Sequence, residues 1–219
     1  MRAEVILDRP WLRMDLPREM RVLSWAPHGA GYTRANAIVW REVRNADLTP
    51  EFDAEGWLSA QMPMRAVGML TSRDVGTYHQ AWAEVEGVTA QCVATVGLSN
   101  AEAVGQRLPY HTADYGTINI GLVTNAALSE AAQLEAMSIV VQARTAGVMA
   151  AGVELATGLA TGTGTDCVAL ACLPGEGRYA GLHTAVGEAV GAAVRDCLTR
   201  ASQAWVIWRD AERARRAAT

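Results

Sequence analysis

The sequence predicts an α+β fold in a single domain, with a mostly antiparallel mixed sheet and two long helices packed on it. Short segments rich in β-branched and aromatic residues, separated by Pro or Gly, fill the first two-fifths of the chain. Two long segments in the second half repeat apolar residues at helical spacing. Half of the 219 residues are hydrophobic and 19% are charged, a balance that supports one buried core. We therefore expect residues 1–219 to form one domain.

Strand-like segments account for the predicted sheet. In the first two-fifths of the chain, their order is that of an antiparallel meander. Glu86-Gly87 then marks the turn of a hairpin, because the segment after it alternates small, polar and β-branched residues. The expected strands are residues 5–7, 11–14, 21–25, 37–43, 67–71, 78–85, 88–97, 118–123 and 167–172.

Helices are predicted at three places. Thr49-Pro50-Glu51 combines a capping hydroxyl, a proline and an acid, which predicts a short helix through Trp57 and Leu58. Ser129 can cap a long helix that covers one face of the sheet. The last helix is expected to start near His183, and its Gly187 and Gly191 would allow close approach to a neighbouring helix. The apolar positions are Leu134, Met137, Val141 and Val148 in the first long helix and Val186, Val190, Val194, Cys197, Ala201, Trp205 and Trp208 in the second.

Composition excludes several mechanisms. The sequence contains no lysine, so a Schiff-base lysine, a lysine general base and a Walker-type phosphate lysine are all excluded. The net charge of −4 gives no general attraction for nucleic acid, and the cluster of Arg213, Arg215 and Arg216 is expected to be a solvated helix end. The four cysteines have neither zinc-ribbon nor redox spacing, so reduced thiols are expected.

The sequence indicates a cytoplasmic protein. Its first residues do not resemble a secretory signal, and no apolar run approaches the ~18 residues of a spanning helix. We therefore expect neither a membrane nor a nucleic acid as partner. A homo-oligomer is compatible with Trp205 and Trp208, which would pack either in the core or across a dimer.

Four polar clusters interrupt the apolar pattern at the ends of expected strands, where binding and catalytic residues commonly lie. The run at 160–166 is the most unusual, because its backbone N–H groups and hydroxyls are suited to cradling an anion or an oxyanion. It precedes a strand and lacks lysine, unlike a phosphate-binding loop. The candidates are Ser99 and Asn100 in the first cluster, Asn119 in the second, Gly162, Thr163, Gly164, Thr165 and Asp166 in the third, and His183, Thr184 and Glu188 in the fourth.

Several interpretations of these candidates stay open. Asp166 either takes part in chemistry or binds the N–H groups of its own loop. Asn119 either braces a loop or faces a ligand, since a buried amide needs partners. His111 and Asp114 would form a metal site with Asp166 and His183, but no short ligand spacing supports this, so no metal is assigned. The nucleophile elbow of serine hydrolases is absent.

The four clusters, in this order, resemble the adenosylcobinamide amidohydrolase family of corrinoid salvage. The resemblance is strongest over 88–198 and leaves 200–219 as a C-terminal helical extension. It implies hydrolysis of the amide that joins a corrin propionyl side chain to aminopropanol, giving adenosylcobyric acid. Some relatives of this kind accept complete cobamides such as pseudocobalamin. Arg144-Thr145 departs from the Lys-Thr expected in relatives, which puts a substrate contact there in doubt.

Residue chemistry suggests direct attack of water, with no cofactor required. His183 would act as general base, Asp166 would orient it, and Asn119 would help the backbone N–H groups stabilise the oxyanion. Thr163 or Thr165 as a covalent nucleophile is the alternative mechanism. A non-catalytic corrinoid carrier and a nucleotide-binding regulator are the alternative functions. The residues expected to contact substrate are Ser99, Asn100, Gly162, Gly164, Thr184 and Glu188.

Overall fold

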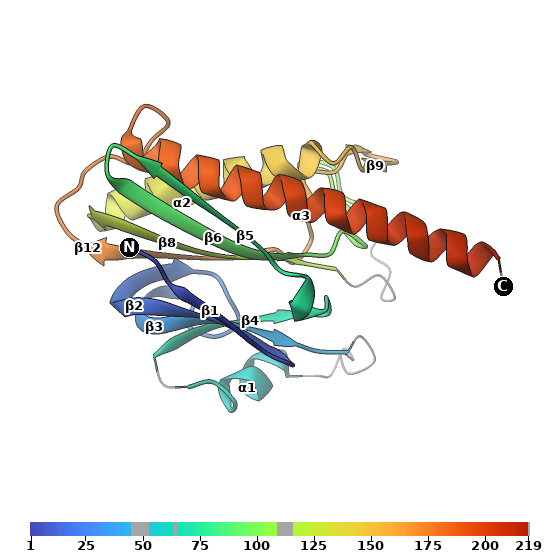
Figure 1. Ribbon diagram of the computed structural model, residues 1–219, viewed down its shortest axis with the longest axis horizontal. Coiled ribbons are helices and arrows are strands. Elements are labelled where there is room, and N and C mark those ends of the chain that lie inside the picture. Colours follow the sequence, from blue (N-terminus) through green and yellow to red (C-terminus); the bar gives the residue numbers. More distant parts are fainter. Residues whose placement is uncertain (45–52, 64, 109–115, 219) are drawn as a thin grey trace.

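The computed structural model describes residues 1–44, 53–63, 65–108 and 116–218, and its strands form one curved eight-stranded sheet within that part of the chain (Figure 1). The order is β4-β3-β2-β12-β8-β6-β5, with β1 paired to β2. The strands of this sheet are β1 (Glu4–Asp8), β2 (Trp11–Ser24), β3 (Gly31–Glu42), β4 (Ala66–Thr71), β5 (His79–Val85), β6 (Val88–Val96), β8 (Ile118–Leu128) and β12 (Cys167–Pro174).

The pairing confirms the predicted mostly antiparallel mixed sheet. Only β3 with β4 and β8 with β12 are parallel among the described pairs. The expected strands at 11–14 and 21–25 are two parts of β2, whose register shifts between Asp15 and Met20. The strand expected at 118–123 continues to Leu128.

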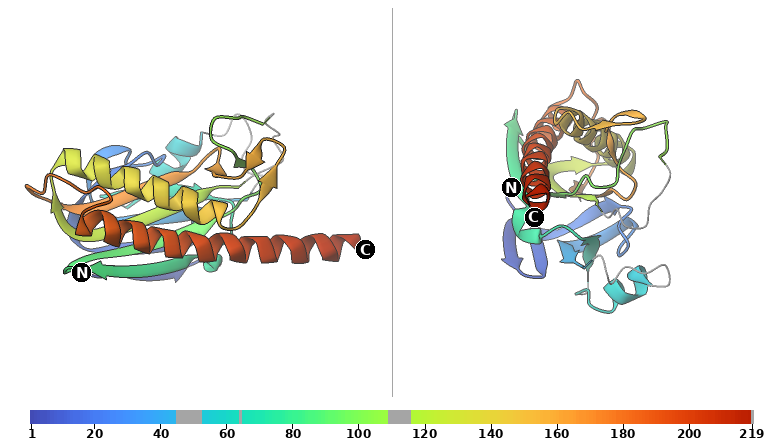
Figure 2. Two further views of the ribbon diagram at one scale, coloured as in Figure 1. Left: turned by 90° about the horizontal axis from the view of Figure 1, so that it is seen from above. Right: turned by 90° about the vertical axis from the view of Figure 1, so that its right-hand side faces the viewer.

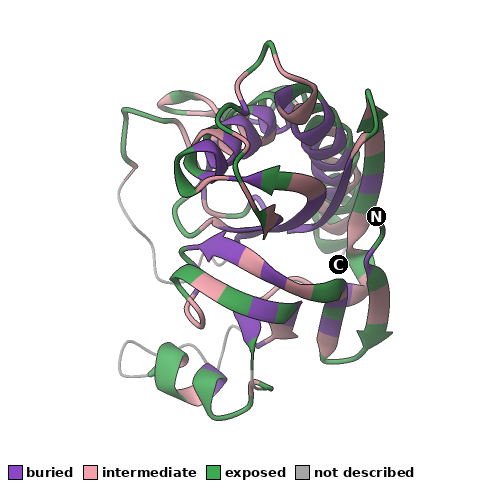
Figure 3. Ribbon diagram, turned by 90° about the vertical axis from the view of Figure 1, so that its left-hand side faces the viewer, coloured by how far each residue is buried: buried purple, intermediate pink, exposed green. Residues whose placement is uncertain are grey.

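Two clusters of buried apolar side chains lie on opposite faces of the central strands. Figure 3 shows buried positions along these strands and on the inner sides of the long helices. Cys92 and Leu122 point to the core under the long helices α2 (Glu130–Met149) and α3 (Ala185–Ala217). Their neighbours Val93 and Val123 point to a second core, which the curved N-terminal strands close with side chains such as Trp40. Alternation along a strand explains both clusters, because successive side chains point to opposite faces.

The two long helices lie side by side on one face of the sheet, as predicted, and α3 projects beyond the body (Figure 2). Ser129 caps α2 by accepting from the N–H of Ala132 at 3.2 Å. The predicted apolar face of α2 is wrong at Leu134, which is 56% exposed. On α3, a Cβ added at Gly187 would lie 2.1 Å from the carbonyl oxygen of Gly181, so this glycine accommodates the preceding loop rather than another helix.

The remaining elements are short. Helix α1 (Ala54–Ser59) is capped by Asp53, which accepts from Gly56 N at 2.9 Å. The predicted cap, Thr49, lies outside the described residues. Strands β7 (Ala101–Glu102) and β11 (Gly162–Thr163) pair with each other, β9 (Glu154–Leu155) pairs with β10 (Gly158–Leu159), and η2 (Val75–Thr77) is a single 3-10 turn.

Two sequence expectations concern cysteines and membrane spans. All four cysteines are free thiols, and burial raises the pKa of Cys167 to about 11, so this thiol is a poor nucleophile.

Across the described helices, none combines the length and the apolar character that a membrane crossing requires.

Candidate functional site

Three of the four polar clusters meet at one end of the sheet. At this end β6 finishes and β8 and β12 begin, because Asn119 pairs with both Thr95 and Cys167. The pairing of β11 with β7 places Thr163 opposite Ala101, directly after the first cluster. The sheet thus brings segments about 65 residues apart in sequence into one group.

Asp166 is the centre of this group. Its side chain is only 5% exposed and forms an ion pair with Arg144. The carboxylate also accepts from the N–H groups of Ile118 and Thr163, both at 3.1 Å, and from the hydroxyl of Thr163. Burial raises the pKa of Asp166, while the Arg144 guanidinium and the bonds from Thr163 and Ile118 offset part of that increase.

Arg144 is a site residue that sequence reasoning missed. The departure from Lys-Thr drew attention to this position, but the partner of the arginine could not be inferred from it. Position 144 lies one helical turn from Val140 and from Val148, both of which are fully buried. An arginine on an otherwise buried helix face requires an acidic partner, and this was the available signal.

The two threonines considered as nucleophiles, Thr163 and Thr165, differ in their acceptors. The Thr163 hydroxyl donates to the Asp166 carboxylate, which can accept a proton. The Thr165 hydroxyl donates to the carbonyl oxygen of Gly116 at 3.0 Å, which cannot. Gly162 is buried against Asp166, whereas Gly164 faces open space. The arrangement therefore distinguishes Thr163 from Thr165 as a nucleophile.

Asn119 braces the site from behind. The residue is fully buried, and its Nδ2 donates to the carbonyl oxygen of Leu70 at 2.6 Å. Its Oδ1 accepts from the hydroxyl of Thr117 at 3.3 Å. One of the two amide N–H groups is thus bound to β4, and the oxyanion role of Asn119 stays a prediction. Of the two interpretations, the structure supports the brace.

Two neighbouring cavities open beside this group, with volumes of about 370 and 450 Å³. Ser99, Trp205 and Trp208 line both of them. The larger one is also lined by Leu98, Val153, Glu154, Leu155, Arg209, Glu212, Arg213 and Arg216, and the smaller one by Glu42, Ser72, Arg73, Asp74, Thr77, Gly97 and Gly116.

Gly116 connects the smaller cavity to the acidic group. A Cβ at this position would lie 2.7 Å from the carbonyl oxygen of Gly97 and 2.8 Å from the Ser99 nitrogen, so the close approach requires glycine. The Oδ1 atom of Asn100 lies beside Gly116 and is buried without a hydrogen-bond partner among the described residues. Ser99 thus lines the cavity where the first two clusters meet, and the buried Asn100 oxygen lies beside Gly116.

The fourth cluster lies at the opposite end of β12 (Figure 1). Asp166 precedes this eight-residue strand and His183 follows it, and eight residues of strand span about 25 Å. The loop before His183 is anchored near the start of α2, where Ala180 N donates to Glu135 at 2.6 Å. Arg144, which holds Asp166, lies nine residues further along that helix. The predicted convergence of Asp166 and His183 within one chain is therefore wrong.

The other members of the fourth cluster have structural or solvent-exposed positions. The Thr184 hydroxyl caps α3 by accepting from Gly187 N at 3.0 Å. Glu188 and His183 are exposed to solvent. Among the described residues, no group of three or more His, Cys, Asp or Glu side chains is arranged to hold a metal ion. His111 and Asp114, named above as metal ligands, lie outside the described residues.

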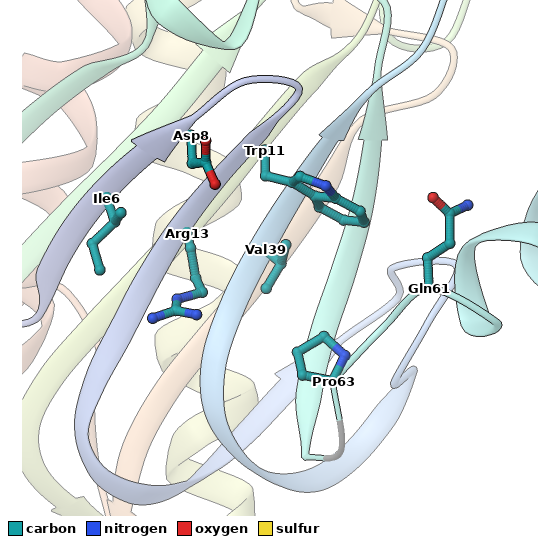
Figure 4. A pocket seen from close by; sticks show the side chains of 7 residues that line it. All are labelled: Ile6, Asp8, Trp11, Arg13, Val39, Gln61 and Pro63. Carbon is teal, nitrogen blue, oxygen red and sulfur yellow. The ribbon is translucent and has the colours of Figure 1, made fainter.

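A third cavity of about 240 Å³ lies on the outer side of β1, β2 and β3 (Figure 4). No residue of the four polar clusters lines it, so it is separate from the candidate site. Its lining residues are Ile6, Asp8, Trp11, Arg13, Val39, Gln61 and Pro63.

At the start of β12, the buried Asp166 carboxylate accepts from the Thr163 hydroxyl, and Gly116, which accepts from Thr165, lines the smaller cavity. The sequence profile of one protein family, described as adenosylcobinamide amidohydrolase, matches residues 1–210. The chain belongs to this family and is thus an amidohydrolase of corrinoid salvage. No protein of curated function matches the chain at a significant level. The match includes Trp205 and Trp208, which the resemblance of the four clusters had left out.

Proposed function

We propose that adenosylcobinamide is cleaved at the start of β12, beside the cavities lined by Ser99 and Trp208. The products are adenosylcobyric acid and 1-aminopropan-2-ol. The observation that carries this proposal is the meeting of three polar clusters around the buried Asp166–Arg144 pair, next to the two cavities. Cavities of several hundred Å³ suit part of a bulky ligand such as a corrin.

Thr163 is the proposed nucleophile, and Asp166 accepts its proton. The Thr163 oxygen attacks the amide carbon, its proton passes to Asp166, and a tetrahedral oxyanion forms. The C–N bond then breaks, Asp166 passes the proton to the leaving amine, and an ester joins Thr163 to the corrin side chain. Water hydrolyses this ester and regenerates the hydroxyl. The bond from the Thr163 hydroxyl to Asp166 supports these roles.

The loop itself supplies the remaining groups. The N–H groups of Gly164 and Thr165 belong to exposed residues and are proposed to stabilise the oxyanion. Ser99 and Asn100 are proposed to position the corrin side chain at the smaller cavity. Complete cobamides such as pseudocobalamin share the amide that is cleaved, and we include them as proposed substrates.

We further propose that catalysis uses no resident metal. Both oxygens of Asp166 are engaged by Arg144, Thr163 and Ile118, which makes this carboxylate a poor metal ligand. Dialysis against a chelator is therefore expected to leave the rate of aminopropanol release unchanged. A rate that falls and is restored by one added metal ion would contradict this part of the proposal.

Rapid-quench mass spectrometry of the intact protein tests the nucleophile. During turnover of adenosylcobinamide, the protein mass is expected to increase by the adenosylcobyryl group, with the adduct on the peptide that contains Thr163. Thr163→Ser is expected to keep the adduct and Thr163→Ala to lose it. Thr165→Ala serves as the matched control from the same loop. Full turnover by Thr163→Ala would contradict the covalent mechanism and favour direct attack of water.

A further inference from the structure

Arg73 lines the smaller cavity, and no carboxylate of the described part of the chain is hydrogen-bonded to its guanidinium. Arg73 follows β4, and its backbone N–H donates to the hydroxyl of Thr71 at 3.0 Å. The guanidinium carbon lies 4.1 Å from the ring centroid of Trp208. Its Nε is buried without a hydrogen-bond partner among the described residues. An aromatic ring, rather than an acid, therefore holds this half-buried cation.

The nearest acids are bound to other groups. Asp74 forms an ion pair with Arg9, with Nη2 at 3.0 Å from Oδ1. Glu42 lines the same cavity, and its carboxylate accepts from the N–H of Val75 at 3.0 Å. Burial lowers the pKa of Arg73, and the charge of Asp74 offsets only part of this decrease. Removing a cation from water costs free energy unless acceptors compensate it, and the described chain supplies few.

Arg73 lies in the cavity where the corrinoid is proposed to bind. The smaller cavity is also lined by Ser99 and Gly116 from the first two clusters. Trp208 lines the smaller cavity and also the larger one, which Arg213 and Arg216 line as well. Acids line both cavities as well, Glu42 and Asp74 the smaller one and Glu154 and Glu212 the larger one. Because Asp74 binds Arg9 and Glu42 binds the N–H of Val75, the Arg73 guanidinium is left to bind an anionic group on the molecule that enters the smaller cavity.

Resting on the function proposed above, we propose that Arg73 and Trp208 form an oxyanion-binding site for a carboxylate or phosphate ester of the corrinoid. A planar guanidinium binds either group through two parallel hydrogen bonds, and an aromatic face stabilises the same plane. Hydrolysis converts a neutral amide into a carboxylate, whereas complete cobamides carry a phosphodiester. Both sources present the same chemistry to Arg73.

Binding measurements test this site without depending on turnover. Isothermal titration calorimetry compares the Thr163→Ala protein with the Thr163→Ala/Arg73→Gln double variant. Thr163→Ala is expected to prevent hydrolysis during the titration. The ligands are adenosylcobinamide, adenosylcobyric acid and an adenosylated complete cobamide. We expect Arg73→Gln to weaken binding of at least one of the two anionic corrinoids about 10- to 100-fold, with little effect on adenosylcobinamide. If adenosylcobyric acid loses affinity, Arg73 binds the carboxylate. If the complete cobamide loses affinity, Arg73 binds the phosphodiester.

Two further variants serve as controls. Arg73→Lys keeps the charge but not the planar fork, so part of the affinity is expected to remain. Arg195→Gln removes an exposed arginine of α3 outside both cavities and is expected to bind all three ligands like the parent. Unchanged binding of both anionic corrinoids by Arg73→Gln would overturn the proposal. An equal loss for all three ligands would overturn it as well.

The proposed function can fail separately from this site. If Asp166→Asn hydrolyses adenosylcobinamide at the parent rate, the catalytic assignment is wrong. The preference of Arg73 for anionic corrinoids would still be measured independently in that case.

Discussion

The two ends of β12 are similar in composition but differ in how their polar residues are used. Glycines and threonines accompany both Asp166 at the start and His183 beyond the far end. The Asp166 carboxylate is buried and receives donors from three segments, whereas the His183 imidazole faces solvent. A charge removed from water must be compensated by surrounding groups. Converging donors on a buried charge, rather than a glycine-rich motif, therefore distinguish the candidate site.

Substitution of Asp166 is expected to have the largest effect. Asp166→Asn keeps the shape but removes the proton acceptor of Thr163, so kcat for adenosylcobinamide should fall by about 10²–10⁴. The matched control is Glu188→Gln, which removes an exposed carboxylate at the other end of the molecule. The unfolding midpoint of each variant shows whether the fold is retained. Equal turnover by Asp166→Asn and Glu188→Gln would show that the start of β12 is no more important for catalysis than the far end.

A methyl group at Gly116 is expected to disturb the cavity. In Gly116→Ala the new Cβ would lie 2.7 Å from a backbone oxygen, which should cost about 1–3 kcal/mol of unfolding free energy and reduce turnover. Gly164→Ala provides the control, because nothing lies within 4 Å of its Cβ. Urea unfolding and steady-state kinetics measure both effects. Comparable losses of unfolding free energy in the two variants would contradict the close packing assigned to Gly116. Turnover of Gly116→Ala is compared with that of the parent, because the Gly164 N–H is itself proposed to stabilise the oxyanion.

Stability should depend on pH through Asp166. Its folded-state pKa is raised above the ordinary value of 3.8, so the folded protein retains this proton more strongly than the unfolded chain. The contribution to unfolding free energy is therefore greatest below pH 3.8 and decreases as pH rises through the raised pKa. The difference between the parent and Asp166→Asn, measured by urea unfolding across this range, isolates the contribution. A difference that changes in the opposite direction would show that Arg144 outweighs burial.

Substitution of His183 is expected to have the smallest effect. The imidazole is exposed and lies about 25 Å from Asp166 along β12, so His183→Ala should keep kcat within about twofold of the parent. Steady-state hydrolysis of adenosylcobinamide measures this directly. A loss of two orders of magnitude in a folded His183→Ala protein would place the imidazole in the reaction. It would also require a second chain to bring the two ends together.

Much of the fold follows from local signals. Ser129 and Thr184 cap the helices that the spacing predicts, and the turn at Glu86-Gly87 joins the predicted hairpin. These features depend on neighbouring residues and are visible in sequence. The curvature that brings Trp40 beneath the central strands depends on contacts between distant segments, and the local pattern does not contain it.

The site was predictable to a smaller extent. The third cluster drew attention to Asp166 and Thr163 and left open whether Asp166 binds N–H groups of its own loop. The bond from Thr163 N to Asp166 bears out that structural contact, while the catalytic role stays a prediction. The sequence predicted a strand at 167–172 between Asp166 and His183, but it gave no indication that the loop after this strand leaves His183 at the far end instead of returning to Asp166. Arg144 and Arg73 belong to elements far from the clusters in sequence, so only the fold relates them to the site. Side-chain chemistry was thus accessible from sequence, and spatial convergence was not.

A structure of the protein with adenosylcobyric acid tests the central claim most directly. The account predicts that the corrin side-chain carboxylate lies at the cavity between Ser99 and Gly116, at the start of β12. Density for the corrin against the loop that carries Tyr179 and His183, with the cavity at Ser99 filled by solvent, would contradict it.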